Sequence, residues 1–265
     1  MKPLRVSLVQ GATRWHDAAA NRAYYGALVG GLAGRTDIVV LPETFLSGFT
    51  NETLGNAESM DGEGLAWLRA LARETAAVVT GSLVVREGER CLNRLVWMRP
   101  DGSFARYDKR HLFRMAGEHE RYAGGAERLV VEIGGWRVCP QVCYDLRFPV
   151  WSRNRYDRAA GRFDYDLLLY VANWPEARRD PWRTLLRARA IENLCYCVGV
   201  NRVGVDGNQL RYAGDSAVID FAGAPLVELG AQEQVVTTTL DPLALAAHRE
   251  RFPAWMDADE FVLAP

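Results

Sequence analysis

The strongest constraint on the fold is a series of ten short apolar runs that are distributed along most of the chain. Runs of this length, bounded by Gly, Pro or polar residues, are typical of buried β-strands. The expected strands are Val6–Val9, Ile38–Leu41, Val78–Val85, Leu95–Met98, Leu129–Ile133, Val138–Val142, Leu167–Val171, Cys195–Val200, Ala217–Ile219 and Val235–Leu240. The chain is therefore predicted to build extensive β-sheet.

Helical patterns lie between some of these runs and turn sequences lie between others. The expected helices are Ala18–Leu32, Gly64–Ala76, Pro149–Ala160 and Pro181–Asn193. The turn sequences at 99–102 (Arg-Pro-Asp-Gly) and 134–135 (Gly-Gly) predict hairpins, which make the adjacent strands antiparallel. The pattern indicates a mixed α/β fold, but it does not decide whether the strands form one sheet or two.

Composition fits one domain with a sizeable core. Of the 265 residues 49% are hydrophobic, and no internal repeat, low-complexity tract or linker divides them, so residues 1–265 are predicted to form a single domain. The final segment, 246–265, alternates charged, aromatic and Pro residues and has little core pattern.

Charge and cysteine usage limit the partners and the compartment. With 32 Lys+Arg against 33 Asp+Glu, no global field favours nucleic acid or an anionic membrane. No apolar stretch has the length of a membrane span, and the run near the N-terminus is too short for a signal peptide. The five cysteines show no disulfide framework or Cys-x-x-Cys pattern, which is typical of a reducing compartment. We expect a cytoplasmic protein without nucleic-acid or membrane partners.

Cys143 is the first candidate for chemistry. An apolar strand ends at this thiol, and the chain then turns toward a helix. A cysteine at a strand-to-helix turn lies close to free backbone N–H groups, which favour the thiolate and can hold an oxyanion. Cys91, Cys139, Cys195 and Cys197 are expected to behave as small core residues.

Glu43 and Lys109 each place an ionisable group at the edge of an apolar stretch. Together with Cys143 they occur in the chain order Glu, Lys, Cys, and at this point the sequence resembles the nitrilase superfamily of carbon–nitrogen hydrolases. The segments similar to family blocks are Leu41–Phe45, Lys109–Phe113, Cys143–Pro149, Arg187–Asn193, Asn201–Gly204 and Gly214–Asp220. The resemblance spans Val6 to about Pro225.

The resemblance implies a four-layer α-β-β-α sandwich of two mixed sheets, with the 246–265 tail packed at a dimer interface. It also implies a second carboxylate beside Lys109, for which spacing to Tyr122 and Gly125 favours Glu118, while Glu120 stays open. No cofactor or metal is expected, since the four histidines and five cysteines lack metal-ligand spacing.

Hydrolysis of an amide needs a strong nucleophile, a proton for the departing nitrogen and stabilisation of an oxyanion. We assign the attack to the Cys143 thiol, proton transfer to Glu43, and oxyanion stabilisation to the Lys109 ammonium and the backbone N–H of Tyr144. Lys109 is also expected to favour the thiolate of Cys143. The covalent intermediate is then a thioester, which water hydrolyses.

Two rival arrangements of the thiol need testing. A Cys–His pair would use His111, which lies two residues after Lys109, although in the resembling family this position is structural. A redox protein would use Cys139 with Cys143, but sheet geometry is expected to hold the two sulfurs apart.

Residues near Cys143 must select the amide. Arg147, four positions later, is a candidate for binding a carboxylate, and a structural ion pair with Asp145 or another acid is the alternative. Trp174 and Phe49 are expected to wall a small pocket, or else to lie in the core.

The Lys109–Phe113 block and the residues after it look most like bacterial omega-amidases. Such enzymes release ammonia from the terminal amide of 2-oxo acids such as 2-oxoglutaramate and 2-oxosuccinamate. We therefore expect a small-molecule amide that carries a carboxylate as the substrate. The alternatives are a deaminated glutathione amidase, another small aliphatic amidase, and a non-catalytic assembly protein that keeps the fold.

Overall fold

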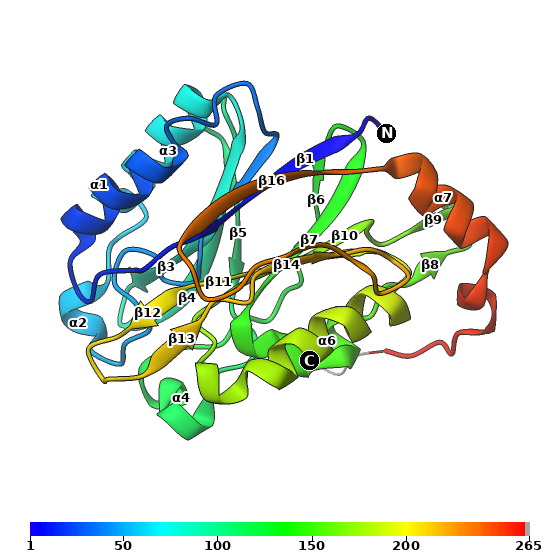
Figure 1. Cartoon of the computed structure of the whole chain (residues 1–265). Helices are drawn as coiled ribbons and strands as arrows, with labels where there is room; N and C mark the ends of the chain where they lie inside the picture. Colours follow the sequence, from blue (N-terminus) through cyan, green and yellow to red (C-terminus); the bar gives the residue numbers. More distant parts are fainter. Residues whose placement is uncertain (263–265) are drawn as a thin grey trace.

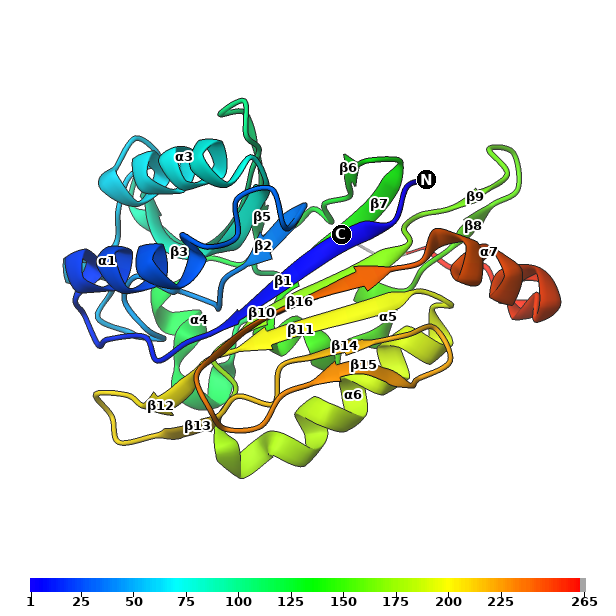
Figure 2. The same cartoon turned by 45° about the horizontal axis from the view of Figure 1, so that its top comes forward.

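The computed structural model describes residues 1–262 and contains two six-stranded mixed sheets packed face to face (Figures 1 and 2). The strand order in the first sheet is β16-β1-β2-β3-β4-β5, and that in the second is β15-β14-β11-β10-β7-β6. Strands β1, β2 and β3 are parallel neighbours, as are β7, β10 and β11, and the remaining pairs are antiparallel.

The strands of the first sheet are β1 (Leu4–Gln10), β2 (Ile38–Val40), β3 (Val78–Glu87), β4 (Arg90–Met98), β5 (Phe104–Asp108) and β16 (Gln234–Leu240). Those of the second are β6 (Val131–Ile133), β7 (Trp136–Val142), β10 (Leu167–Ala172), β11 (Tyr196–Asn201), β14 (Ala217–Ile219) and β15 (Pro225–Glu228). Two small hairpins complete the strands, β8 (Tyr156–Asp157) with β9 (Arg162–Phe163), and β12 (Val203–Val205) with β13 (Arg211–Ala213).

Helices cover the outer face of each sheet. In both views α1 (Ala18–Val29) and α3 (Glu63–Thr75) lie on one side of the sheet pair, and α6 (Arg179–Glu192) lies on the opposite side (Figures 1 and 2). The shorter helices are α2 (Thr53–Asn56), α4 (Glu118–Arg121), α5 (Pro149–Ser152) and α7 (Pro242–Arg251). The predicted four-layer α-β-β-α sandwich is confirmed.

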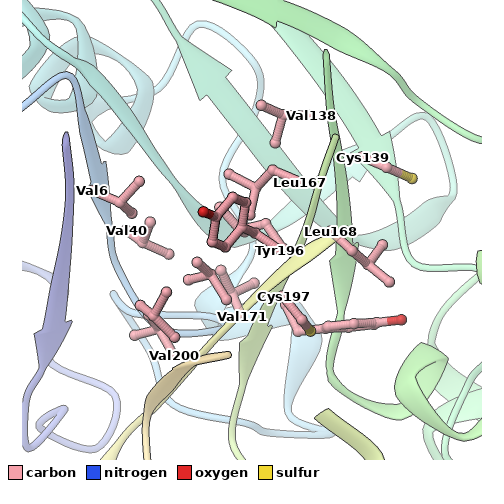
Figure 3. Close-up of a cluster of buried hydrophobic side chains, with 14 of the residues drawn as sticks. Val6, Val40, Val138, Cys139, Leu167, Leu168, Val171, Tyr196, Cys197 and Val200 are labelled. Atoms are coloured by element: carbon pink, nitrogen blue, oxygen red, sulfur yellow. The ribbon is translucent and has the colours of Figure 1, made fainter. Parts of the chain in front are cut away.

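Strand β2 shows why the sheets stack in this order. Alternate side chains of a strand point to opposite faces, and β2 is apolar on both. Ile38 and Val40 belong to the core between the sheets, while Val39 and Leu41 pack with residues of α1 and α3. Figure 3 shows the inter-sheet core, with Val6 and Val40 opposite Val171 and Val200. A strand buried on both faces is held tightly, and so is the loop that follows it.

The predicted helix Pro149–Ala160 is wrong beyond Ser152, because α5 ends there and the β8–β9 hairpin follows. The buried side chain of Asn154 donates to the carbonyls of Tyr165 and Asn193, and its N–H donates to the Asn193 side chain. These tertiary bonds compete with helical ones and pull the segment toward the second sheet.

Several elements were absent from the sequence prediction. The strands β5, β12, β13 and β15 are short and partly exposed, and α7 begins in a segment where no helix was expected. The side chain of Asp241 caps α7 by accepting from the N–H groups of Leu243 and Ala244, and Pro242 occupies its first turn. Both predicted hairpin turns are confirmed, since 99–102 joins β4 to β5 and 134–135 joins β6 to β7.

The 246–265 tail contains the end of α7 and a 3₁₀ turn at Ala254–Asp257, and its residues 263–265 lie outside the described part. Trp255 packs on Tyr156 of the β8–β9 hairpin, with ring centroids 3.8 Å apart. None of the helices within residues 1–262 combines the length and apolar character that crossing a bilayer requires.

Candidate active site

The predicted catalytic residues follow the ends of strands. Glu43 comes shortly after β2 and Cys143 directly after β7, and both strands have parallel neighbours. The carboxyl ends of parallel strands are where α/β folds place their ligand sites. Lys109 follows β5, the edge strand of the first sheet. The face-to-face packing of the sheets brings these three strand ends together.

Cys143 begins a 3₁₀ helix, Cys143–Arg147, with a φ of +46°. The backbone of a residue other than glycine is strained in this left-handed region, so the surrounding structure must hold Cys143 there. The fully buried Asp145 carboxylate does so by accepting from the N–H of Val142 (3.1 Å) and from the hydroxyl of Tyr107 (2.7 Å). The turn directs the thiol away from the strand and leaves the first N–H groups of the 3₁₀ helix without an intrahelical acceptor.

A buried ion cluster lies beside the thiol. The ammonium of Lys109 is 2.9 Å from Oε1 of Glu43 and 2.9 Å from both carboxylate oxygens of Glu118. The backbone N–H of Phe113 donates to Glu118 at 2.6 Å. Glu120, the alternative second carboxylate, is exposed. The structure therefore brings Glu43, Lys109 and Glu118 together and leaves Glu120 outside.

Two asparagines that the sequence interpretation missed hold this cluster. Asn93 Nδ2 donates to Glu43 at 2.8 Å and lies 3.4 Å from Oε1 of Glu118. Asn173 donates its N–H to the Glu43 carboxylate at 2.7 Å and its side-chain amide to the Glu43 carbonyl at 2.8 Å. Asn173 directly follows β10, just as Cys143 follows β7. This shared position at a strand end was a sequence signal that could have identified Asn173 as a site residue. Asn93 lies in β4 next to Arg94, in a strand that is otherwise mostly apolar, and this position was a weaker signal.

The expected effect of Lys109, which is to favour the thiolate of Cys143, is present but is outweighed by burial. Burial and the negative charge of Glu43 raise the pKa of the Cys143 thiol well above its ordinary value, and the ammonium of Lys109 offsets only part of this rise. The sulfur is therefore protonated near neutral pH. Its proton has to leave as the sulfur attacks, and Glu43 is the adjacent base.

The cluster has one more carboxylate than ammonium. Burial lowers the pKa of Lys109, but Glu118 and Glu43 outweigh burial and hold that pKa well above its usual value, so Lys109 stays charged. Burial and the charge of Glu43 raise the pKa of Glu118, against the opposing charge of Lys109. Because a buried excess of negative charge favours protonation, the cluster can accept one proton, such as that of the neighbouring thiol.

A cavity of about 250 Å³ has Cys143 and Lys109 in its wall. The four residues predicted to bind substrate, Phe49, Tyr144, Arg147 and Trp174, all line it. The other lining residues are Phe113, Met115, Ala116, Asn173, Pro175, Arg178, Leu210 and Tyr212. The geometry thus places an apolar chamber with a few polar groups next to the thiol, as small-ligand sites usually have.

The alternative of an Arg147–Asp145 ion pair is not supported. Asp145 is occupied by Tyr107, by the N–H of Val142 and by His111. The guanidinium of Arg147 instead lies over the ring of Trp174, 4.9 Å from its centroid. Arg147 is therefore available to a ligand in the cavity.

The rival uses of the thiol fit the structure poorly. Nδ1 of His111 is 2.7 Å from Oδ1 of Asp145, and its ring stacks on Phe148, so His111 supports the turn from outside the cavity. Cys139 is buried in β7, where burial raises the pKa of its thiol to about 12. No disulfide joins the five cysteines, and within residues 1–262 no group of three or more His, Cys, Asp or Glu side chains could hold a metal ion.

Comparison with known proteins assigns the family. The model of the carbon–nitrogen hydrolase family matches residues 5–250. The chain is 47% identical to an omega-amidase of Yersinia enterocolitica, over 99% of this chain and all of that protein. It is 33% identical to a 2-oxoglutaramate amidase of Bacillus subtilis, over 83% of this chain and 84% of that protein.

A solved structure agrees over the full length. A superfamily protein of Xanthomonas campestris, whose crystal structure has an arsenic adduct in the active site, is 63% identical and superposes with a TM-score of 0.98 over 100% of both chains. Sequence and fold therefore agree, and the chain belongs to the carbon–nitrogen hydrolase family, that of the nitrilase superfamily.

Proposed function

We propose that this protein is an omega-amidase that releases ammonia from the terminal amide of short 2-oxo dicarboxylic acid monoamides. The observation that carries the proposal is the position of the Cys143 thiol, which lies beside a buried Glu–Lys–Glu cluster and in the wall of a small cavity that also contains arginines. The full-length similarity to an omega-amidase and the similarity to a 2-oxoglutaramate amidase support the substrate class.

Acylation begins when the Cys143 sulfur attacks the amide carbon and its proton passes to Glu43. The C–S bond forms, and the carbonyl oxygen becomes an oxyanion that the Lys109 ammonium and the N–H of Tyr144 stabilise. Glu43 then gives the proton to the nitrogen as the C–N bond breaks, which releases ammonia and leaves a thioester. Asn93 and Asn173 keep the Glu43 carboxylate in place during both transfers.

Deacylation uses the same groups in reverse order. Glu43 takes a proton from a water molecule, whose oxygen attacks the thioester carbon, and the Lys109 ammonium and the N–H of Tyr144 again stabilise the oxyanion. The C–S bond breaks and the proton returns to sulfur. Glu118 keeps Lys109 oriented through both of its carboxylate oxygens, so we assign it as a positioning residue.

Cavity size favours short acids over deaminated glutathione. A volume of about 250 Å³ lies below the roughly 300–1,000 Å³ of common ligand pockets. Phe49 and Trp174 border it, and the ammonium of Lys109 is 5.3 Å from the Phe49 ring centroid. These side chains leave room for an extended four- or five-carbon acid.

Ammonia release from 2-oxoglutaramate, succinamate and deaminated glutathione at equal concentration tests the assignment. Faster turnover of the two short acids is expected. Preference for deaminated glutathione would overturn the substrate class, and the absence of turnover on all three would favour a non-catalytic assembly protein.

We further propose that the protein works as a cytoplasmic homodimer of single-domain subunits, with the 246–265 tail at the interface. Five free, buried cysteines suit a reducing compartment, and Phe252 and Met256 are apolar side chains that the tail leaves exposed. Light scattering of the full chain and of a Phe252→Glu variant tests the interface: the variant should dissociate, and a monomeric parent would contradict the dimer.

A further inference from the structure

The cavity contains a second arginine that the sequence interpretation did not select. Arg178 lies in the 3₁₀ turn Glu176–Arg178, between β10 and α6, and lines the cavity together with Arg147. Both side chains are half-buried. The wall of one small cavity thus holds two guanidinium groups besides the Lys109 ammonium.

Neither guanidinium has an acidic partner in the described part of the chain. Among residues 1–262 no carboxylate oxygen lies within 4.0 Å of Arg147 or Arg178. The next residue, Arg179, points elsewhere and binds Asp215 at 2.8 Å. The neighbouring Arg179 is therefore neutralised by an acid, whereas the two arginines that line the cavity are left for a ligand.

Aromatic rings hold both arginines in place. The guanidinium of Arg147 lies over Trp174, and that of Arg178 lies over Phe113, 5.4 Å from the ring centroid. The indole N–H of Trp174 donates to the carbonyl of Arg178 at 2.7 Å, which links the two positions. Stacking of this kind fixes the plane of a guanidinium and leaves its N–H donors directed outward, where they can bind a carboxylate. One nitrogen of Arg178 also lies 3.5 Å from the sulfur of Met115, a weak acceptor that a carboxylate can displace.

We propose that Arg178, together with Arg147, binds the carboxylate of the substrate and thereby selects acidic amides. This inference rests on the proposed amidase function. A carboxylate is repelled by the excess negative charge of the Glu43–Lys109–Glu118 cluster and attracted by the two arginines, so the acid turns its neutral amide toward Cys143. The 2-oxo oxygen beside the carboxylate offers these donors a further acceptor.

Kinetics on a matched pair of substrates test this assignment. Succinamate carries a carboxylate where succinamide, of nearly the same size, carries a second amide. Arg178→Gln should raise KM for succinamate by about 10- to 100-fold, the usual cost of a lost charge-assisted hydrogen bond, and leave kcat/KM for succinamide within about threefold. Arg178→Lys should recover part of the loss, because it restores the charge without the planar fork.

Arg211→Gln is the matched control. Arg211 pairs with Glu176 at 3.1 Å near the same turn but does not line the cavity, so its loss should leave both substrates unaffected. Equal losses on the two substrates in Arg178→Gln would indicate a structural role and overturn the proposal, as would no loss on either.

A binding measurement separates this proposal from the amidase assignment. Succinate should raise the melting temperature of the parent and of Arg211→Gln but not that of Arg178→Gln, because a ligand of the folded state stabilises it. Succinate binding that survives Arg178→Gln would overturn the arginine assignment even where no amide is hydrolysed. Absence of amide turnover by the parent, together with succinate binding that depends on Arg178, would instead count against the proposed function.

Discussion

The two cysteines of the β7 segment are both buried, but their surroundings differ. Cys139 lies within the strand among apolar side chains, and Cys143 lies just past its end, beside Glu43 and Lys109. Burial raises the pKa of both thiols. The difference teaches that a raised pKa does not by itself make a thiol inert. A thiol with an adjacent base and a cavity can lose its proton during attack, whereas one sealed in a sheet cannot.

The largest expected effect comes from removing each sulfur in turn. Cys143→Ala should lower kcat for succinamate by at least about 10⁴-fold, because no other group can form the thioester. Cys139→Ala should retain kcat within about twofold and lose about 1 kcal/mol of stability through a small cavity. Ammonia release and urea denaturation of both variants give the two quantities. Comparable activity losses in the two variants would erase the distinction between the cysteines.

The next effect concerns the base that distinguishes Cys143. Glu43→Gln keeps the shape of the side chain but cannot take the thiol proton, so kcat should fall by up to about 10⁴-fold. The melting temperature should fall only modestly, because the contacts to Asn93 and Lys109 can be kept while the hydrogen bond accepted from the Asn173 N–H is lost. Activity within tenfold of the parent would show that another group accepts the proton.

A smaller effect is expected at the second carboxylate. Glu118→Gln weakens the hold on Lys109 and should lower kcat by about 10²-fold, the usual result of a misplaced catalytic group. The exposed Glu120 provides the control, and Glu120→Gln should match the parent. A larger loss in Glu120→Gln than in Glu118→Gln would reverse the assignment of the two carboxylates.

The mildest test uses pH. The pKa of Cys143 is raised, so its thiolate fraction should still grow about tenfold per pH unit between pH 7 and 9. Alkylation by iodoacetamide, located by peptide mass spectrometry, should follow that rise at Cys143 and leave Cys139 unmodified until the protein unfolds. A rate at Cys143 that is flat across this range would mean a preformed thiolate.

Sequence reasoning went furthest where local pattern and tertiary structure coincide. The apolar runs at β2, β7 and β10 predicted their strands, and the Glu–Lys–Cys order placed three side chains that the fold brings together. It failed where distant contacts decide, as at Asn154, whose bonds to Tyr165 and Asn193 end a predicted helix.

The same limit explains what the sequence did not show at the site, namely the burial of Cys143 and the position of Arg178. The sequence placed Lys109 near the thiol but did not show how deeply Cys143 is buried, and burial dominates its pKa. Arg178 follows a strand in a run of charged residues, and nothing local distinguishes it from Arg179. Only the fold shows that one lines the cavity and the other binds Asp215.

The central claim is that Cys143, and not Cys139, forms the covalent intermediate. Acid quenching during turnover of succinamate, followed by peptide mass spectrometry, tests it most directly. In the parent we predict a mass increase equal to succinamate minus ammonia on Cys143, located by fragmentation of its peptide, and no increase on Cys139. In Glu43→Gln we predict no increase on either cysteine. A thioester on Cys139, or turnover by Cys143→Ala, would contradict the account.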